Sequence, residues 1–126
     1  MSNVHVSYHF DGILEPLQES IKKYVNLNLY ANPDVEQPLL KPYFKKIFTN
    51  KPEAQLDVSV HVSKNKIDRF EGTFIFTVDG NATRYSREGS GSFKNPTDLV
   101  NHAFAHFKHE ITGEKWLFKT IGKWFR

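Results

Sequence analysis

The sequence predicts an α+β domain with the element order β-α-β-β-β-α, in which two helices pack on one face of a four-stranded sheet. Three observations predict this class. Three segments alternate apolar and polar residues with a period of two, as half-buried strands do, and a shorter fourth segment follows a hairpin turn signal. Two longer segments place apolar residues at helical spacing. Because each predicted helix has one apolar stripe, a single layer of helices on one sheet face buries both stripes.

The first strand is predicted at 4–10, where Val4, Val6, Tyr8 and Phe10 alternate with polar residues. Asp11-Gly12 then ends the strand. A first helix is predicted at 13–29, because its apolar residues fall at helical spacing: Leu14, Leu17, Ile21, Tyr24 or Val25, and Leu29. Pro16 fits the first turn of that helix, where its missing N–H group costs nothing.

Two further strands are predicted at 55–63 and 70–78, separated by the turn signal Lys64-Asn65-Lys66. Asp79-Gly80 is a strong hairpin signal, and a shorter strand at 82–87 follows it. These three strands, joined by hairpins, complete the sheet with the strand at 4–10.

The second helix is predicted to begin at Asn95-Pro96, an N-cap candidate followed by a proline at the first helical position. Its apolar stripe consists of Leu99, Val100, Ala103, Phe104, Phe107 and Ile111. Gly113 is the predicted C-terminal cap of this helix.

Residues 31–53 contain four of the six prolines, and proline interrupts regular structure. We therefore predict a Pro-rich basic loop insertion here, in which 43–48 forms a single helical turn at most. The predicted organisation is one domain over 1–113 that includes this insertion, followed by a basic aromatic tail at 114–126.

The composition excludes several classes of protein. The chain has 126 residues and no cysteine, which rules out disulfides, thiol catalysis and cysteine-ligated metal sites. It contains no apolar run of about 20 residues and no recognisable secretory signal, so a cytoplasmic location is expected. No nucleophile elbow, phosphate-binding loop or dinucleotide fingerprint is present. We expect a non-enzymatic protein with no small-molecule substrate, cofactor or metal.

The charge is modestly basic and unevenly spread. Lys and Arg number 17 against 14 Asp and Glu, and 41–51 has four lysines with no acid. Such patches suggest an anionic partner, either nucleic acid or a membrane surface, although a merely solvated surface is an equal alternative. The candidate phosphate contacts from charge alone are Lys41, Lys45, Lys46, Lys64, Lys66, Arg69, Arg84 and Arg87.

His102, His106 and His109 form one stripe of the second helix, opposite its apolar stripe. Three interpretations remain open. Two histidines at i and i+4 can supply part of a zinc site, but no further ligand is evident. The stripe can also be an ordinary solvated face, or it can face RNA and stack on bases.

The tail at 114–126 places Leu117, Ile121, Trp124 and Phe125 at helical spacing, with basic residues between them. A segment of this kind can pack on its own domain, contact RNA, or lie on a membrane or in a partner's groove. Its candidate RNA contacts are Lys115, Lys119, Lys123 and Arg126.

The segment 57–111, which begins DVSVHVSKNKIDRF, resembles the ribosome hibernation promoting factors, and 15–25 (EPLQESIKKYV) resembles their first helix. The resemblance to the short form of this family, the ribosome-associated translation inhibitors, covers roughly 4–111 without the 31–53 insertion. It rests on element order and pattern rather than on a diagnostic motif.

The resemblance implies a translation regulator of the stress response that binds ribosomal RNA in the mRNA and tRNA channel of the small subunit. Such a protein competes with mRNA and tRNA, blocks translation and protects idle ribosomes. The family's RNA-facing basic positions correspond here to Lys22 or Lys23 and to His106, Lys108 and His109. Long members carry a second domain that pairs ribosomes; since the chain has none, we expect no self-pairing and a monomer off the ribosome.

The chain departs from the family pattern at two kinds of position. His106 and His109 stand where lysine or arginine is usual, and Asn95 stands where the second helix usually starts with an acid. The basic residues of 41–51 and of the tail are candidates to supply the missing charge. An alternative function is a protein- or membrane-interaction module that acts through the tail. A double-stranded RNA binder is a third, but the strand at 4–10 argues against it.

Overall fold

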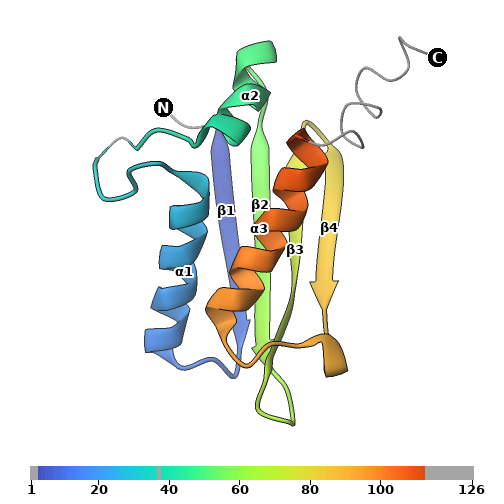
Figure 1. The fold of residues 1–126 in the computed structure, drawn as a ribbon. Coiled ribbons are helices and arrows are strands. Elements are labelled where there is room, and N and C mark those ends of the chain that lie inside the picture. The colour runs from blue at the N-terminus through green and yellow to red at the C-terminus, as the bar shows by residue number, and fades with distance from the viewer. Residues whose placement is uncertain (1–2, 37, 113–126) are drawn as a thin grey trace, which may run out of the picture.

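The computed structural model describes residues 3–36 and 38–112 (Figure 1). In chain order the elements are β1 (Val4–Asp11), α1 (Glu15–Leu29), α2 (Pro42–Asn50), β2 (Leu56–Lys64), β3 (Phe70–Val78), β4 (Asn81–Arg87), a short 3₁₀ turn (Gly89–Gly91) and α3 (Pro96–Thr112). The predicted order β-α-β-β-β-α is present, with α2 as an additional helix. The predicted bounds of β3 agree with the structure residue for residue.

The four strands form one mixed sheet in the order β1-β2-β3-β4. β1 runs parallel to β2, while β2–β3 and β3–β4 are antiparallel pairs. At the β3–β4 hairpin, Asp79 and Gly80 both have positive φ, 48° and 86°. That is the geometry that an Asp-Gly hairpin turn requires, so the hairpin prediction is confirmed.

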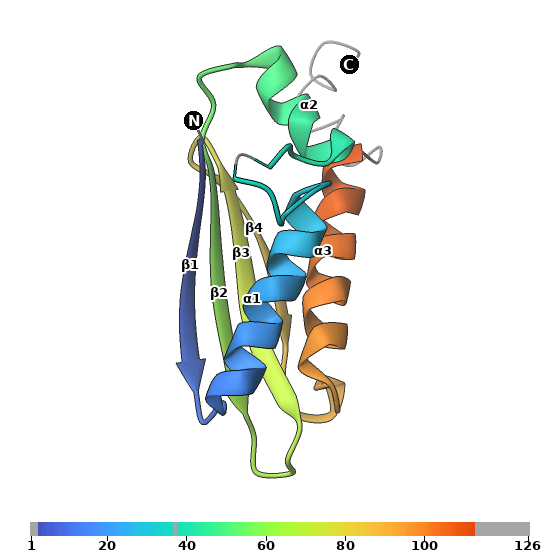
Figure 2. The same ribbon diagram turned by 90° about the vertical axis from the view of Figure 1, so that its left-hand side faces the viewer.

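Both α1 and α3 lie on the same face of the sheet, as Figure 2 shows, and this confirms the predicted fold class. The core lies between the layers, where alternate strand residues such as Val58, Val60 and Phe74 meet Ile21 and Leu99. All five are buried. Within the described ranges, no helix combines the length and apolar character needed to cross a bilayer.

The prediction of a loop insertion at 31–53, with a single helical turn at most, is wrong, because α2 has nine residues. Pro42 occupies the first turn of α2, so this proline favours the helix instead of breaking it. Phe44 is 0% exposed and Ile47 is 5% exposed, and both join the main core. Hydrogen bonds from Ala31 N to Leu39 O and from Lys41 N to Leu29 O close the segment that precedes the helix.

The end of α2 is tied to the β3–β4 hairpin by an exposed ion pair. Lys51 Nζ lies 2.9 Å from Asp79 Oδ2, and Asp79 Oδ1 accepts a hydrogen bond from the Gln55 amide at 3.0 Å. The hydrogen bond from Lys51, together with that from Gln55, lowers the pKa of the Asp79 carboxyl. In the same way, the hydrogen bond to Asp79 raises the pKa of Lys51. The pair is therefore a pH-dependent link between α2 and the hairpin.

Asp79→Asn is expected to lower the melting temperature at pH 7 and to have no effect in strong acid. Asparagine keeps the acceptor for Gln55 and tolerates positive φ, so the variant removes mainly the charge. Because the pKa of Asp79 is lower in the folded state, its contribution is present above the unfolded value of about 3.9 and is lost as pH falls through the folded value. Melting curves from pH 7 down to pH 2 test this, and a temperature difference that persists at pH 2 would contradict it.

Candidate nucleic-acid interface

The predicted RNA contacts are spread over the molecule and do not form one continuous patch. Lys22 and Lys23 lie on α1; Lys41, Lys45 and Lys46 lie at α2; Lys64, Lys66 and Arg69 lie at the β2–β3 loop; Arg84 and Arg87 lie on β4; and His102, His106, Lys108 and His109 lie on α3. In Figure 1, α2 and the β2–β3 loop are at opposite ends of the sheet. The structure thus divides the predicted set into separate groups. The four tail residues lie outside the described residues.

Several of these cations have partners within the fold. Lys22 lies 3.6 Å from Glu19, and Lys64 Nζ lies 2.9 Å from Asp68. Arg69 is half-buried; its Nε donates to Ser92 Oγ at 3.1 Å, and its Nη2 donates to the Ser92 carbonyl oxygen. The guanidinium of Arg69 therefore joins the start of β3 to the segment before α3. The exposed pairs of Lys22 and Lys64 are weak and can exchange for a phosphate.

One group of predicted residues is brought together along β4 and α3. The β4–α3 surface, as we call it, consists of Arg87, Phe93, His102 and His106, with Tyr85 beneath them. The Arg87 guanidinium lies 5.7 Å from the ring centre of Phe93 and 5.8 Å from that of Tyr85. Arg87, His102 and His106 are exposed, while Phe93 is half-buried and Tyr85 is buried. An exposed cation is thus held against two aromatic rings.

The two histidines extend this surface along the helix. The His102 ring centre is 4.9 Å from that of Phe93, and the His106 ring centre is 5.6 Å from that of Tyr85. Both contacts follow from the helical spacing of i and i+4, which puts the two imidazoles on one face of α3. Alternation along β4 turns Tyr85 and Arg87 toward the same helix. The result is a row of planar groups on the surface.

The electrostatics of this surface depend mainly on Arg87, whose guanidinium is a permanent positive charge. Burial raises the pKa of the Tyr85 phenol, although the nearby Arg87 guanidinium acts in the opposite direction. The phenol is thus protonated at neutral pH. Its oxygen is buried and has no hydrogen-bond partner among the described residues. Tyr85 therefore supports the surface mainly through its ring, which lies beneath the Arg87 guanidinium.

Residues of this kind can bind single-stranded or looped nucleic acid. Guanidinium groups contact phosphates and stack on bases, and aromatic and imidazole rings stack on unpaired bases. The sequence pattern pointed to Arg87, His102 and His106 but not to Phe93 or Tyr85. Tyr85 could have been predicted from the sequence, because it lies two residues before Arg87 on a predicted strand and therefore shares its face.

No protein-family model, curated protein or solved structure matches the chain. The resemblance to the ribosome hibernation promoting factors accordingly stays a prediction that rests on element order and residue pattern.

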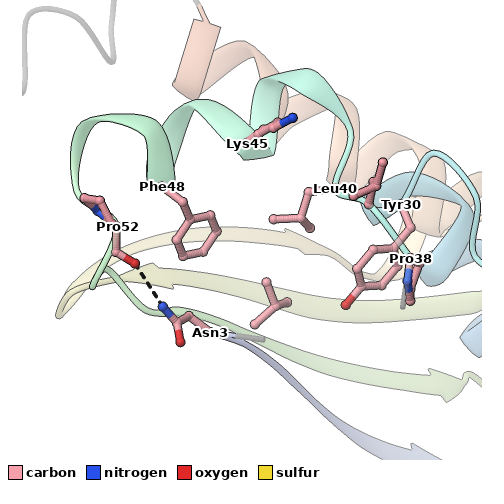
Figure 3. A pocket seen from close by; sticks show the side chains of 9 residues that line it. Asn3, Tyr30, Pro38, Leu40, Lys45, Phe48 and Pro52 are labelled. Carbon is pink, nitrogen blue, oxygen red and sulfur yellow. Dashed lines mark hydrogen bonds between the residues drawn. The ribbon is translucent and has the colours of Figure 1, made fainter. Parts of the chain in front are cut away.

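The lysines of α2 lie apart from the β4–α3 surface. Lys45 lines a groove of about 310 Å³ between α2 and the start of β1, together with Tyr30, Leu40, Phe48 and Pro52 (Figure 3). This groove is at the β1 edge of the sheet, and β4 is the opposite edge. Lys108 on α3 lies beside α2, since its Nζ is 4.6 Å from the ring centre of Tyr43.

Within the part of the chain that the structure describes, no further metal ligand lies beside the α3 histidines, so the zinc interpretation of that stripe is not supported. All three histidines are exposed on α3. Among the described residues, the group of His, Asp and Glu side chains close enough to share a metal ion is His9, Asp11 and His61, on β1 and β2. The sequence pattern did not point to that group.

Proposed function

We propose that this protein binds structured RNA through the β4–α3 surface, and that its target is the ribosomal RNA of the small subunit. The observation that carries the proposal is the position of exposed Arg87 over the rings of Phe93 and Tyr85, beside two exposed histidines. The choice of the small subunit is supported by the resemblance to hibernation factors. The protein then acts in the cytoplasm, on ribosomes that are not translating.

The proposed mechanism is steric and electrostatic. Arg87 pairs with a phosphate, and the planar groups of His102, His106 and Phe93 offer faces to unpaired bases. Bound in the decoding channel, the domain occupies space that mRNA and tRNA need. Counterions are released as phosphates are neutralised, so the affinity falls as the salt concentration rises.

The test is co-sedimentation with purified small subunits at low and high salt. The variant Arg87→Ala/His102→Ala/His106→Ala is expected to bind at least about tenfold more weakly than wild type, since loss of one stacked base alone costs about 1–3 kcal/mol. Arg84→Ala is a matched control. Arg84 is an exposed arginine on the same strand, but alternation places it on the open face of the sheet.

Three results would overturn the proposal in different ways. If wild type stays unbound at low salt, the ribosomal target is wrong. If it binds but the triple variant binds equally well, the β4–α3 surface is not the contact. If Arg84→Ala loses as much affinity as the triple variant, the effect reflects net charge and not this surface. Competition by tRNA would support binding in the channel.

A further inference from the structure

Three metal-ligating side chains converge on the open face of the sheet, opposite the helices. The Nε2 atom of His9 lies 3.2 Å from Asp11 Oδ2, and Nε2 of His61 lies 3.0 Å from the same oxygen. The two imidazole rings meet edge to face, with ring centres 4.6 Å apart. One ligand atom from each of the three residues lies within 4.8 Å of the others.

The strand register holds this cluster together. β1 and β2 are parallel, and His9 is paired directly with His61. Because side chains alternate along a strand, His9 and Asp11 share a face of β1, and the register adds His61 beside them. β2 is also paired with β3 on its other side, so His61 belongs to an internal strand. The three ligands are thus positioned by sheet hydrogen bonding and not by a loop.

From this geometry we infer that His9, Asp11 and His61 form a binding site for a divalent transition metal, with Zn²⁺ as the preferred ion. Tetrahedral zinc with bonds of about 2.0–2.2 Å to nitrogen and oxygen places its ligand atoms about 3.3 Å apart. The two distances to Asp11 Oδ2 are close to that spacing. Two imidazoles suit zinc, whereas Ca²⁺ and Mg²⁺ prefer sites made of oxygen ligands alone.

The site has three protein ligands, so at least one coordination position faces solvent. The side chains of His9, Asp11 and His61 are 66%, 59% and 49% exposed, so an ion can enter without any rearrangement of the core. A bound ion would join the edge strand β1 to its neighbour β2. Zinc binding should therefore raise the melting temperature, because an ion that binds only the folded state stabilises it.

The experiment is titration of the metal-free full chain with Zn²⁺, followed by calorimetry and by thermal melting. Wild type is expected to bind one equivalent and to melt at a higher temperature with zinc, and a chelator should reverse the shift. Mg²⁺ should produce neither effect. His61→Ala and Asp11→Asn should each weaken zinc binding more than about tenfold, since even loss of a supporting outer group costs about 10–100-fold.

Two control variants make the assignment specific. His5→Ala removes an exposed histidine from the same face of β1, four residues before His9, and should leave zinc binding unchanged. His102→Ala/His106→Ala removes the helical pair on α3 and should also leave it unchanged. Circular dichroism of each variant checks that it is folded.

The ¹⁵N chemical shifts of the imidazoles supply a readout that does not depend on stability. Zinc should shift the signals of His9 and His61 and leave that of His5 in place. The absence of zinc binding by wild type, or undiminished binding by folded His61→Ala, would overturn the inference. If only His102→Ala/His106→Ala loses zinc binding, the ion binds at α3, and this result would also overturn the inference. RNA binding is measured on the other face, so the two proposals can fail independently.

Discussion

Phe44→Ala is expected to lower the free energy of unfolding by about 3–5 kcal/mol, the range for truncation of a fully buried phenylalanine. Phe44 lies on α2 and is 0% exposed. Its ring is stacked on that of Phe107, with centres 5.8 Å apart, and meets Phe104 at 6.0 Å. Alanine would leave a cavity between α2 and α3 that neither helix can fill without moving.

The effect should be large because these rings continue into the sheet. Phe76 on β3 is stacked on Phe107 with ring centres 4.1 Å apart, and it meets Phe104 edge to face at 5.1 Å. Phe44, Phe76, Phe104 and Phe107 thus form one aromatic cluster that joins α2, α3 and β3. Loss of one ring removes dispersion contacts from the others as well. The segment 31–53 therefore contributes to the stability of the whole fold.

Phe48→Ala is the matched control for Phe44→Ala. Phe48 lies one turn further along α2, but it is only half-buried and lines the groove in Figure 3. Its removal should cost about 1–2 kcal/mol, because part of its ring already reaches water. Urea denaturation with a shared slope measures both values. If Phe44→Ala costs no more than Phe48→Ala, α2 is not part of the cooperative core.

The fold could be predicted from the sequence because its signals are local. Alternation of Leu56, Val58, Val60 and Val62 marks a strand in any context, and Asp79-Gly80 specifies a tight hairpin. The start of α3 is also set by a local contact, since Asn95 Oδ1 accepts a hydrogen bond from the Thr97 amide at 3.3 Å. Neighbouring residues set each of these features, so one sequence suffices to find them.

The helix α2 could not be predicted because its stability comes from contacts distant in sequence. The density of prolines suggested a loop, yet Pro42 stands at the first turn, and Pro33, Pro38 and Pro52 lie outside the helix. What holds the helix is the burial of Phe44 against Phe107, far along the chain. Helix propensity is a weak prior, and tertiary contacts of this kind override it.

The candidate sites could be predicted only in part, because they too depend on contacts between residues distant in sequence. Arg87, His102 and His106 were identified as separate basic or polar residues, but their common surface depends on how α3 lies beside β4. His9 and Asp11 are two residues apart, whereas His61 joins them only because β1 pairs with β2 in parallel. Strand alternation predicted which residues share a face; it did not predict which strands are neighbours or in which direction they run.

Gly72→Ala is expected to destabilise the fold by about 1–3 kcal/mol, the usual cost of forcing extra volume into a filled space. A Cβ atom at Gly72 would overlap the carbonyl oxygen of His61, and it would lie 3.2 Å from the Cα atom of Val62. Both obstacles are backbone atoms of the paired strand β2, so relief requires the two strands to separate. Replacing glycine also stabilises a protein by restricting its unfolded chain, but only by about 0.4–1 kcal/mol.

Gly91→Ala is the control for this prediction, because a Cβ atom there would meet only the flexible side chain of Arg87, at 3.5 Å. It should change stability by less than about 0.5 kcal/mol, as surface substitutions usually do. Urea denaturation of both variants gives the comparison, and equal stabilities would mean that β2 and β3 can separate at Gly72 without cost.

If the metal inference is correct, Gly72→Ala should also weaken zinc binding, because a shift of the His61 backbone moves its imidazole relative to Asp11. A variant that is destabilised but keeps full zinc affinity would show that the cluster tolerates movement of β2.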